Sequence, residues 1–152
     1  MIDLYLFRHG DADPRGPDGS DATRALTDRG RIEVREAARG LVRLGVELDV
    51  VLTSPLVRAR ETAAIASEVL RPAGGTHLCD ALGPGGSDAA LFDEIAAQQG
   101  GRVMLVGHIP QLYELASVMV WGRPEGAIVL KKAGLIRVVT QGLPPSARGE
   151  LH

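Results

Sequence analysis

Residues 2–10, IDLYLFRHG, combine a nearly continuous apolar run with two side chains that resist burial. The apolar part, residues 2–7, is typical of a strand that is buried on both faces, as in a parallel sheet. The run ends in Arg8 and His9, which Gly10 follows. A core strand that ends in this way brings two ionisable side chains to one edge of its sheet.

Strand-like and helix-like segments alternate along the rest of the chain. Apolar or β-branched runs predict strands at residues 49–54, 76–82, 102–107, 127–132 and 135–140. Helical patterns lie between them, at residues 28–44, 55–70, 87–99 and 110–120. The alternation predicts an α/β fold, a three-layer α/β/α sandwich with a mainly parallel central sheet. No repeat or linker divides the sequence, so we expect residues 1–152 to form a single domain.

Residues at the helix ends predict where the first two helices begin and end. Thr27 is a candidate N-cap of the first helix, and Gly45 is a candidate stop. Ser54 is a candidate N-cap of the second helix, with Pro55 at its first position. The first helix repeats apolar residues near a helical period, and we expect these to face the core: Ile32, Ala37, Ala38, Leu41 and Leu44.

The composition excludes several classes of protein. A net charge of −2 argues against a broad surface for nucleic acids. The one cysteine, Cys79, cannot form an internal disulfide, and we expect it to be a small buried residue. Asp3 and Arg8 interrupt the N-terminal apolar run, unlike in a signal peptide, and no run reaches the ~20 apolar residues of a membrane span. We therefore expect a cytoplasmic protein that binds neither membranes nor nucleic acids.

Three predicted strands end in residues with useful chemistry. The first strand ends in Arg8 and His9, and the 102–107 strand ends before His108. The second strand leads into the helix that carries Arg58. Because the carboxyl ends of parallel strands meet at one edge of a sheet, we expect these four side chains to lie together. Such a cluster of cations is costly alone and suits a phosphoryl group.

The motifs as a set resemble those of the histidine phosphatase superfamily, also called phosphoglycerate mutase-like. The residues that carry the resemblance are RHGDAD at 8–13, TRALTDRG at 23–30, LTSPLVRARETA at 52–63 and VGHIP at 106–110. Together they span nearly the whole chain. Its short length is most similar to the SixA-type bacterial phosphohistidine phosphatases, since the mutases carry large insertions. The resemblance implies a phosphoglycerate mutase-like fold and a single histidine phosphatase domain over residues 1–152.

The resemblance also implies roles for individual residues. His9 would be the nucleophile that becomes phosphorylated, and His108 would complete the phosphoryl pocket. Arg8 and Arg58 would bind phosphoryl oxygens, for which planar guanidinium groups are well suited. Arg24 matches an arginine that stands before the LT-x-x-G segment, and both substrate binding and a role in the loop stay open.

Other side chains near these motifs have structural interpretations. Arg60 lies two positions after Arg58 and leaves the helix on another face, so we expect it at the surface. Thr62 lies one turn after Arg58, and we expect it to pack behind the pocket.

The predicted chemistry needs neither a metal nor another cofactor. Arginine and histidine side chains supply the positive charge that phosphoryl transfer requires. The acidic loop with Asp11, Asp13, Asp18 and Asp21 does not fit the calcium-binding EF-hand pattern, because Arg15 and other residues replace its ligands. We interpret it as a solvated loop.

The segment after the third predicted strand lacks a glutamate that could protonate an alkoxide leaving group. Asp80 is the nearest candidate acid, and Asp88 is a poorer one because it stands at a predicted helix start. A phosphoramidate leaves as imidazole and needs no strong acid. The sequence therefore favours removal of phosphate from phosphohistidine on a protein, for example a histidine phosphotransfer domain.

Three other functions stay open at this point. One is a phosphomonoesterase of the same superfamily that acts on a small phosphorylated metabolite. Another is a mutase, which would need an enclosed site, and a third is a non-catalytic module that binds phosphate or a phosphoprotein. The sequence does not decide the oligomeric state.

Overall fold

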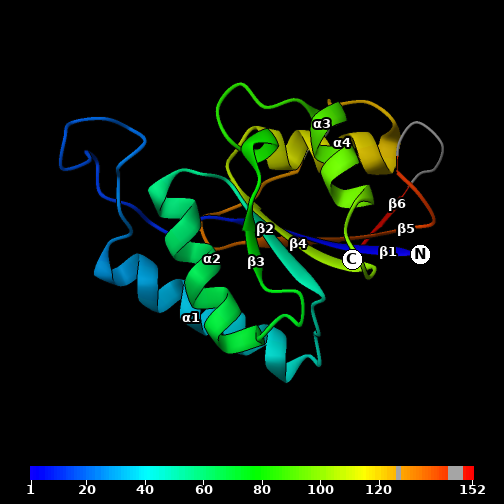
Figure 1. Ribbon diagram of the computed structural model, residues 1–152, viewed down its shortest axis with the longest axis horizontal. Coiled ribbons are helices and arrows are strands. Elements are labelled where there is room, and N and C mark those ends of the chain that lie inside the picture. The colour runs from blue at the N-terminus through cyan, green and yellow to red at the C-terminus, as the bar shows by residue number, and fades with distance from the viewer. Residues whose placement is uncertain (126–127, 144–148) are drawn as a thin grey trace.

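The computed structural model shows a six-stranded sheet between two layers of helices (Figure 1). It describes residues 1–125, 128–143 and 149–152. In the described residues the strand order is β3-β2-β4-β1-β5-β6. The strands are β1 (Ile2–Arg8), β2 (Val50–Thr53), β3 (Thr76–Leu78), β4 (Arg102–Gly107), β5 (Leu135–Thr140) and β6 (Gly149–Leu151). This α/β sandwich confirms the predicted fold class.

The four strands that precede the site residues run parallel. β4 lies at the centre between β1 and β2, with Arg8 opposite Gly107 and Thr53 opposite Val106. β3 pairs in parallel with β2, whereas β5 and β6 add an antiparallel edge on the other side of β1. The carboxyl ends of β1, β4 and β2 therefore stand side by side, as the sequence predicts.

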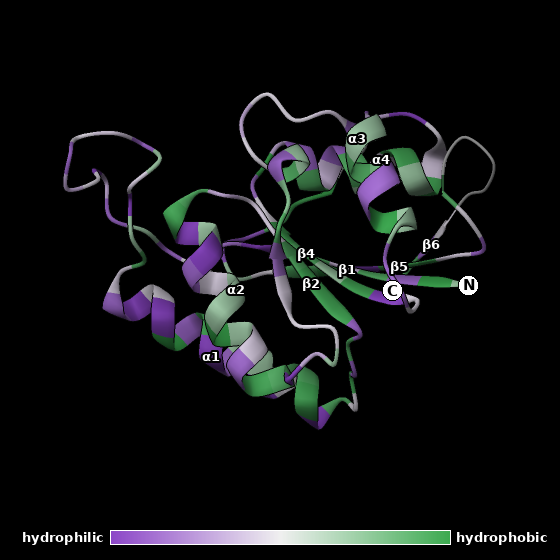
Figure 2. Cartoon of the chain, viewed as in Figure 1, coloured by the Kyte–Doolittle hydropathy of each residue, from purple (hydrophilic) through white to green (hydrophobic). Residues whose placement is uncertain are grey.

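Two helices cover each face of the sheet. α1 (Asp28–Arg43) and α2 (Val57–Leu70) lie together on one face, and α3 (Asp88–Ala96) and α4 (Gln111–Trp121) lie on the other (Figure 1). Apolar residues concentrate in the strands and on the helix faces toward them (Figure 2). Among the described residues, no helix is both long and apolar enough to cross a membrane.

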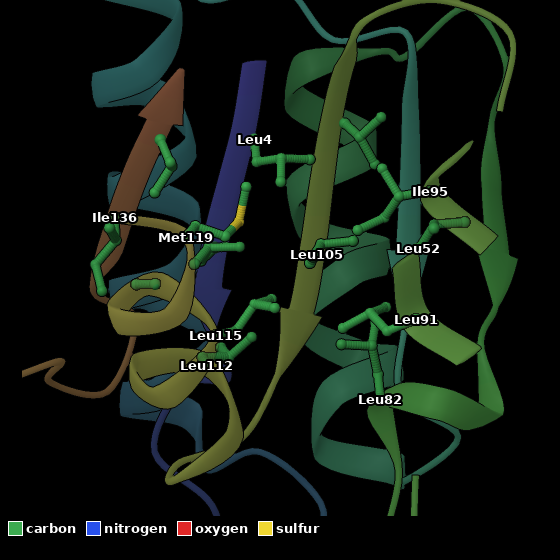
Figure 3. Close-up of a cluster of buried hydrophobic side chains, with 14 of the residues drawn as sticks. Leu4, Leu52, Leu82, Leu91, Ile95, Leu105, Leu112, Leu115, Met119 and Ile136 are labelled. Atoms are coloured by element: carbon green, nitrogen blue, oxygen red, sulfur yellow. The ribbon is translucent and has the colours of Figure 1, made fainter. Parts of the chain in front are cut away.

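Alternate residues of β1 supply the two halves of the core. Leu4 and Leu6 pack with the α3 and α4 side chains, and Figure 3 shows Leu4 among them. Tyr5 and Phe7 belong to the cluster on the α1 and α2 side. A strand buried on both faces must be apolar at nearly every position, which explains its uninterrupted pattern.

The buried stripe of α1 differs in part from the prediction. Val34, Ala38 and Leu41 are buried, but Ile32 and Leu44 are 65% and 80% exposed. Positions 34, 38 and 41 repeat at intervals of four and three and so share one face of the helix. Ile32 lies two residues from Val34, which turns it about 200° away from that face.

Two predicted strands are wrong in extent. Within the predicted 76–82 strand, β3 ends at Leu78, and Asp80–Leu82 form one turn of 3-10 helix. Within 127–132, residue 127 lies outside the described residues, and residues 128–132 form no strand. The apolar composition of this second segment reflects packing only in part, because Leu130 is buried in the core and Ile128 packs against it, whereas Val129 is 85% exposed.

Candidate active site

Neighbouring strand ends place His9, Ser54 and His108 at one edge of the sheet. The backbone N–H of His9 donates to the carbonyl of Gly107 at 3.1 Å, and that of Ser54 donates to the carbonyl of Val106 at 3.0 Å. The rings of His9 and His108 lie 5.1 Å apart between centroids, tilted by 53°. The main chain thus brings both predicted histidines together.

The hydrogen bonds of His9 define which ring nitrogen is free. Nδ1 lies 2.7 Å from the carbonyl oxygen of Gly10, which can only accept, so Nδ1 carries the proton. Nε2 then holds a lone pair in the neutral ring. The residue is 7% exposed, so this lone pair opens onto little bulk water. A fixed tautomer with an accessible Nε2 is the form that a histidine nucleophile requires.

Arg58 points its guanidinium at this nitrogen. Its Nε donates to His9 Nε2 at 3.3 Å, and the residue is only 7% exposed. Arg58 is the second residue of α2, so the start of this helix places it at the sheet edge. Its Nη1 and Nη2 are both bonded to Asp21, at the backbone oxygen and the carboxylate.

Thr62 connects Arg58 to the chain after His9. Its hydroxyl donates to the carbonyl of Arg58 at 2.7 Å and accepts the backbone N–H of Gly10 at 3.1 Å. Thr62 is fully buried, as predicted, and packs behind the site. A Cβ on Gly10 would stand 2.7 Å from Val34, so only glycine lets α1 pack this closely to the first site residues.

Ser54 is bonded to His108 and does not cap α2. Its Oγ lies 2.7 Å from His108 Nε2, whereas the N-cap of α2 is Leu56 and has no side-chain cap. The predicted cap is wrong because the helix begins later, at Val57, although the Ser54 hydroxyl also accepts the backbone N–H of Leu56 at 3.3 Å. His108 Nδ1 is buried and lacks a hydrogen-bond partner among the described residues.

Both histidines strongly favour their neutral forms. Burial is the largest cause and lowers the pKa of His9 to about 4; the positive charges of Arg58, Arg8 and Arg24 act in the same direction. The hydrogen bond to the Gly10 carbonyl opposes this effect. Burial, followed by the charges of His9 and Arg58, lowers the pKa of His108 to about 4 as well. The site thus disfavours protonation of both rings, and the negative charge of a bound anion would raise their pKa values again.

Arg8 lies beside His9 but reaches a different groove. Its Nη1 donates to the carbonyl of Leu130 at 2.9 Å, and its buried Nε has no partner among the described residues. Burial lowers the pKa of this guanidinium. Arg8 lines a groove with Asp11 and Lys132, which form an ion pair at 2.6 Å. The structure therefore does not bring Arg8 into the cavity that Arg58 and His108 line, and its binding of phosphoryl oxygens stays a prediction.

Arg24 and Arg60 both lie away from the centre of the site. Arg24 donates to the backbone oxygen of Asp13 at 2.6 Å and forms an ion pair with Asp21 at 2.9 Å. These contacts support the role in loop structure. Arg60 is exposed at the surface, as predicted.

The two candidate acids differ in position. Asp88 lines a cavity of about 380 Å³ together with Arg58 and His108. Asp80 is exposed and lines a separate groove on the far side of the Pro84–Gly86 segment. Desolvation raises the pKa of Asp88. The structure therefore brings the poorer sequence candidate, and not the nearer one, to the cavity.

Sequence reasoning missed the part that Asp21 plays. It belongs to the loop interpreted as solvated, yet it holds both Arg58 and Arg24. The pattern that could have indicated this role is Asp21-x-x-Arg24, one residue before the LT-x-x-G segment at residues 26–30. In the described part of the chain, no group of three His, Cys, Asp or Glu side chains is placed to hold a metal ion.

Comparison with known proteins agrees with this geometry. The family model of the histidine phosphatase superfamily (branch 1) matches residues 4–79, which include most of β1 and all of α1 and α2. The chain belongs to this superfamily. A protein from Picosynechococcus is 37% identical over 139 residues, which cover 89% of the chain and 83% of that relative. The resemblance inferred from the sequence motifs is confirmed.

A curated relative and a similar solved structure both carry the name SixA. SixA of Escherichia coli is 29% identical over 112 residues, and the match covers 72% of the present chain and 68% of SixA. A solved structure of the protein histidine phosphatase SixA complexed with tungstate matches with a TM-score of 0.83 and 26% identity. That match covers 99% of the chain and 94% of the solved one. The chain is thus a SixA-like enzyme of the phosphatase type.

Proposed function

We propose that the chain is a metal-independent phosphatase that uses His9 as its nucleophile and removes phosphate from phosphohistidine on a protein. The observation that carries this proposal is the pair of contacts on the His9 ring. The carbonyl of Gly10 holds Nδ1–H, and Arg58 points at Nε2. We also propose that residues 1–152 form one domain of this type.

The first step is an in-line attack of His9 Nε2 on phosphorus. With a pKa of about 4, the ring is neutral at cellular pH, and its Nε2 lone pair becomes available when the Nε–H of Arg58 donates to a phosphoryl oxygen instead. Arg58 and Arg8 bind the equatorial oxygens of the phosphoryl group, where negative charge concentrates in the transition state. His108 gains a proton near that charge and donates a further hydrogen bond. The product of this step is a phosphorylated His9, which water then hydrolyses.

The choice of a protein substrate rests on two further observations. The relative from Escherichia coli bears the name phosphohistidine phosphatase, and the similar solved structure that of a protein histidine phosphatase. An imidazole leaving group also needs less help from an acid than an alkoxide does. A phosphorylated histidine on another protein, such as a phosphotransfer domain, is therefore the proposed partner.

A second candidate function is a phosphomonoesterase that acts on a small metabolite. The specific observation in its favour is Asp88, whose raised pKa and position in the cavity suit a proton donor to an alkoxide. In that case Asp88→Asn would abolish ester hydrolysis and spare phosphohistidine cleavage. Asp80→Asn would change neither, because Asp80 lines another groove.

The test is hydrolysis of a phosphohistidine-bearing protein beside a panel of phosphomonoesters, with a chelator present. Wild type and His9→Ala are compared, and acid-labile phosphate on His9 is followed by mass spectrometry. Chelator-resistant loss of phosphate from histidine, abolished by His9→Ala, supports the proposal. Unchanged turnover in His9→Ala would refute the covalent mechanism, and a preference for esters would favour the metabolite phosphatase.

A further inference from the structure

Three carboxylates line the same cavity as Arg58 and His108. They come from separate parts of the fold: Asp21 from the loop before α1, Asp88 from the first turn of α3, and Glu114 from the first turn of α4. A cavity that binds an anionic phosphoryl group gains nothing from further negative charge. The carboxylates therefore need an explanation in terms of the other part of the substrate.

Within the described residues, only one of the three carboxylates forms ion pairs. Asp21 forms ion pairs with Arg58 at 3.1 Å and Arg24 at 2.9 Å. The side chains of Asp88 and Glu114 have no ion pair or hydrogen bond with the rest of the described chain, and both are half-buried. Partial burial disfavours an unpaired carboxylate, and the pKa of Asp88 is raised for this reason. A cation bound beside them would relieve that cost.

The remaining wall of the cavity is largely apolar. Leu56 and Leu82 are buried beneath it, and Ile109 is 39% exposed beside His108. Pro84 and Pro110 also line it, together with three glycines and Gln111, whose amide donates to the carbonyl of Ala81. Apolar surface next to carboxylates suits a flat group with apolar faces and a positive charge at its edge. A protonated imidazole has this character, whereas a sugar or a carboxylate-bearing metabolite does not.

We propose that this cavity selects phosphoryl groups attached to a positively charged leaving group, the protonated imidazole of phosphohistidine, which Asp88 and Glu114 recognise. The inference rests on the proposed function and adds the reason for its substrate preference. The two carboxylates bind the N–H edge of the substrate ring, while Arg58 and His108 hold the phosphoryl oxygens. Anionic metabolites are repelled by the same two groups.

The proposed contact also favours departure of the leaving group. The lone pair of His9 Nε2 forms the new P–N bond as the P–N bond of the substrate breaks, and its electron pair passes to the substrate nitrogen. Because the other nitrogen of that ring already carries a proton, the ring leaves as neutral imidazole. No proton need be transferred in this step, so the two carboxylates act through their negative charge and not as acids.

Binding measurements test the charge preference without turnover. O-phosphoethanolamine has a cationic leaving group, and 3-phosphoglycerate has an anionic one. Their Kd values for the His9→Ala variant are measured by calorimetry at pH 7. We expect the cationic ligand to bind at least tenfold more tightly, and the ratio to fall below threefold when Asp88→Asn and Glu114→Gln are added.

Asp93→Asn is the matched control, because Asp93 is an exposed acid of α3 that does not line the cavity. Its ratio of Kd values should equal that of the parent. A ratio near one in the parent, or a ratio that the double substitution leaves unchanged, would overturn the inference. Neither result depends on whether phosphohistidine is a substrate, so failure of the proposed function remains distinguishable.

Kinetics on the otherwise wild-type enzyme test the imidazole itself. The double substitution should lower kcat/KM for phosphohistidine about tenfold and change that for phenyl phosphate, whose leaving group is uncharged, less than threefold. Equal losses for both substrates would mean that the carboxylates support the pocket in general, which contradicts selection by charge. A loss confined to phenyl phosphate would identify Asp88 as an acid and also overturn the inference.

Discussion

Asp21 holds the far end of the Arg58 guanidinium. Its backbone oxygen accepts from Nη1 at 2.9 Å, and its carboxylate accepts from Nη2 at 3.1 Å. These two nitrogens form the end-on edge of the guanidinium, and Nε lies on the adjacent edge. With the end held, Nε is aimed at His9 Nε2. A loop residue thus sets the direction of the group that faces the candidate nucleophile.

The first prediction concerns this contact. Asp21→Asn keeps the backbone contact but weakens the charge-assisted bond to Nη2, so Arg58 should be held less firmly. Because the Asp21 side chain is 62% exposed, we expect a loss of only about 1 kcal/mol, or about fivefold in kcat/KM. Steady-state kinetics would show the loss mainly in kcat. Asp13→Asn removes the same charge from the same loop and should change kcat/KM less than twofold.

The second prediction concerns the hydroxyl that links α2 to the chain after His9. Thr62→Val preserves the shape of the side chain but leaves the backbone N–H of Gly10 without this partner, whereas the carbonyl of Arg58 keeps the helical N–H of residue 62 as a partner. An unsatisfied buried group costs about 1–3 kcal/mol, so the free energy of unfolding should fall by roughly 2 kcal/mol. Urea denaturation would measure it. Thr62→Ser, which keeps the hydroxyl, should recover most of the stability and the activity.

The contacts of Asp21 and Ser54 show why the site was only partly predictable. A strand end is a local pattern, so the positions of Arg8, His9 and His108 follow from apolar runs and the rule for parallel sheets. Ser54 precedes a proline and resembles an N-cap. Only the fold reveals that its hydroxyl forms a hydrogen bond with His108. Such side-chain contacts join residues more than 30 positions apart, and periodicity carries no signal for them.

The fold shows the same division between local and distant information. β4 and β1 are recognisable because both of their faces are buried. β6, Gly149–Leu151, was not predicted, because three residues at an edge of the sheet carry too little pattern. Its existence depends on the hydrogen-bonding edge that β5 presents.

The third prediction concerns Ser54 as the partner of His108. Ser54→Ala leaves His108 Nε2 without this hydrogen bond, and Nδ1 has no partner among the described residues either. The ring should lose its fixed orientation, so kcat should fall about tenfold and tungstate should bind more weakly. Ser117→Ala is the control, since Ser117 is equally buried but is bonded within α4. If both variants lost the same activity, the hydrogen bond would have no specific role.

The last prediction is a loss of stability in mild acid. The pKa values of His9 and His108 are about 4 in the fold, against an ordinary value of 6.5. Between pH 6.5 and 4 these two histidines are therefore protonated in the unfolded chain but remain neutral in the folded one. The free energy of unfolding decreases as the pH falls through this range. Lowering a pKa to this extent corresponds to roughly 3 kcal/mol for each ring. Above pH 6.5 the slope fades, because the unfolded rings lose their protons too, and it is negligible by about pH 8.

Urea denaturation between pH 4.5 and 7.5 would measure this slope. Replacing both rings, by His9→Asn and His108→Asn, should flatten it across that range. His77→Gln is the control, because His77 is exposed and lies on β3 away from the site. Carboxylates with lowered pKa values, such as Asp18 and Asp49, begin to destabilise the fold only below about pH 5, where the unfolded chain starts to protonate them, so the slope between pH 5 and 6.5 reports the histidines. A slope that persisted without both rings would show that the histidines are not buried in their neutral forms.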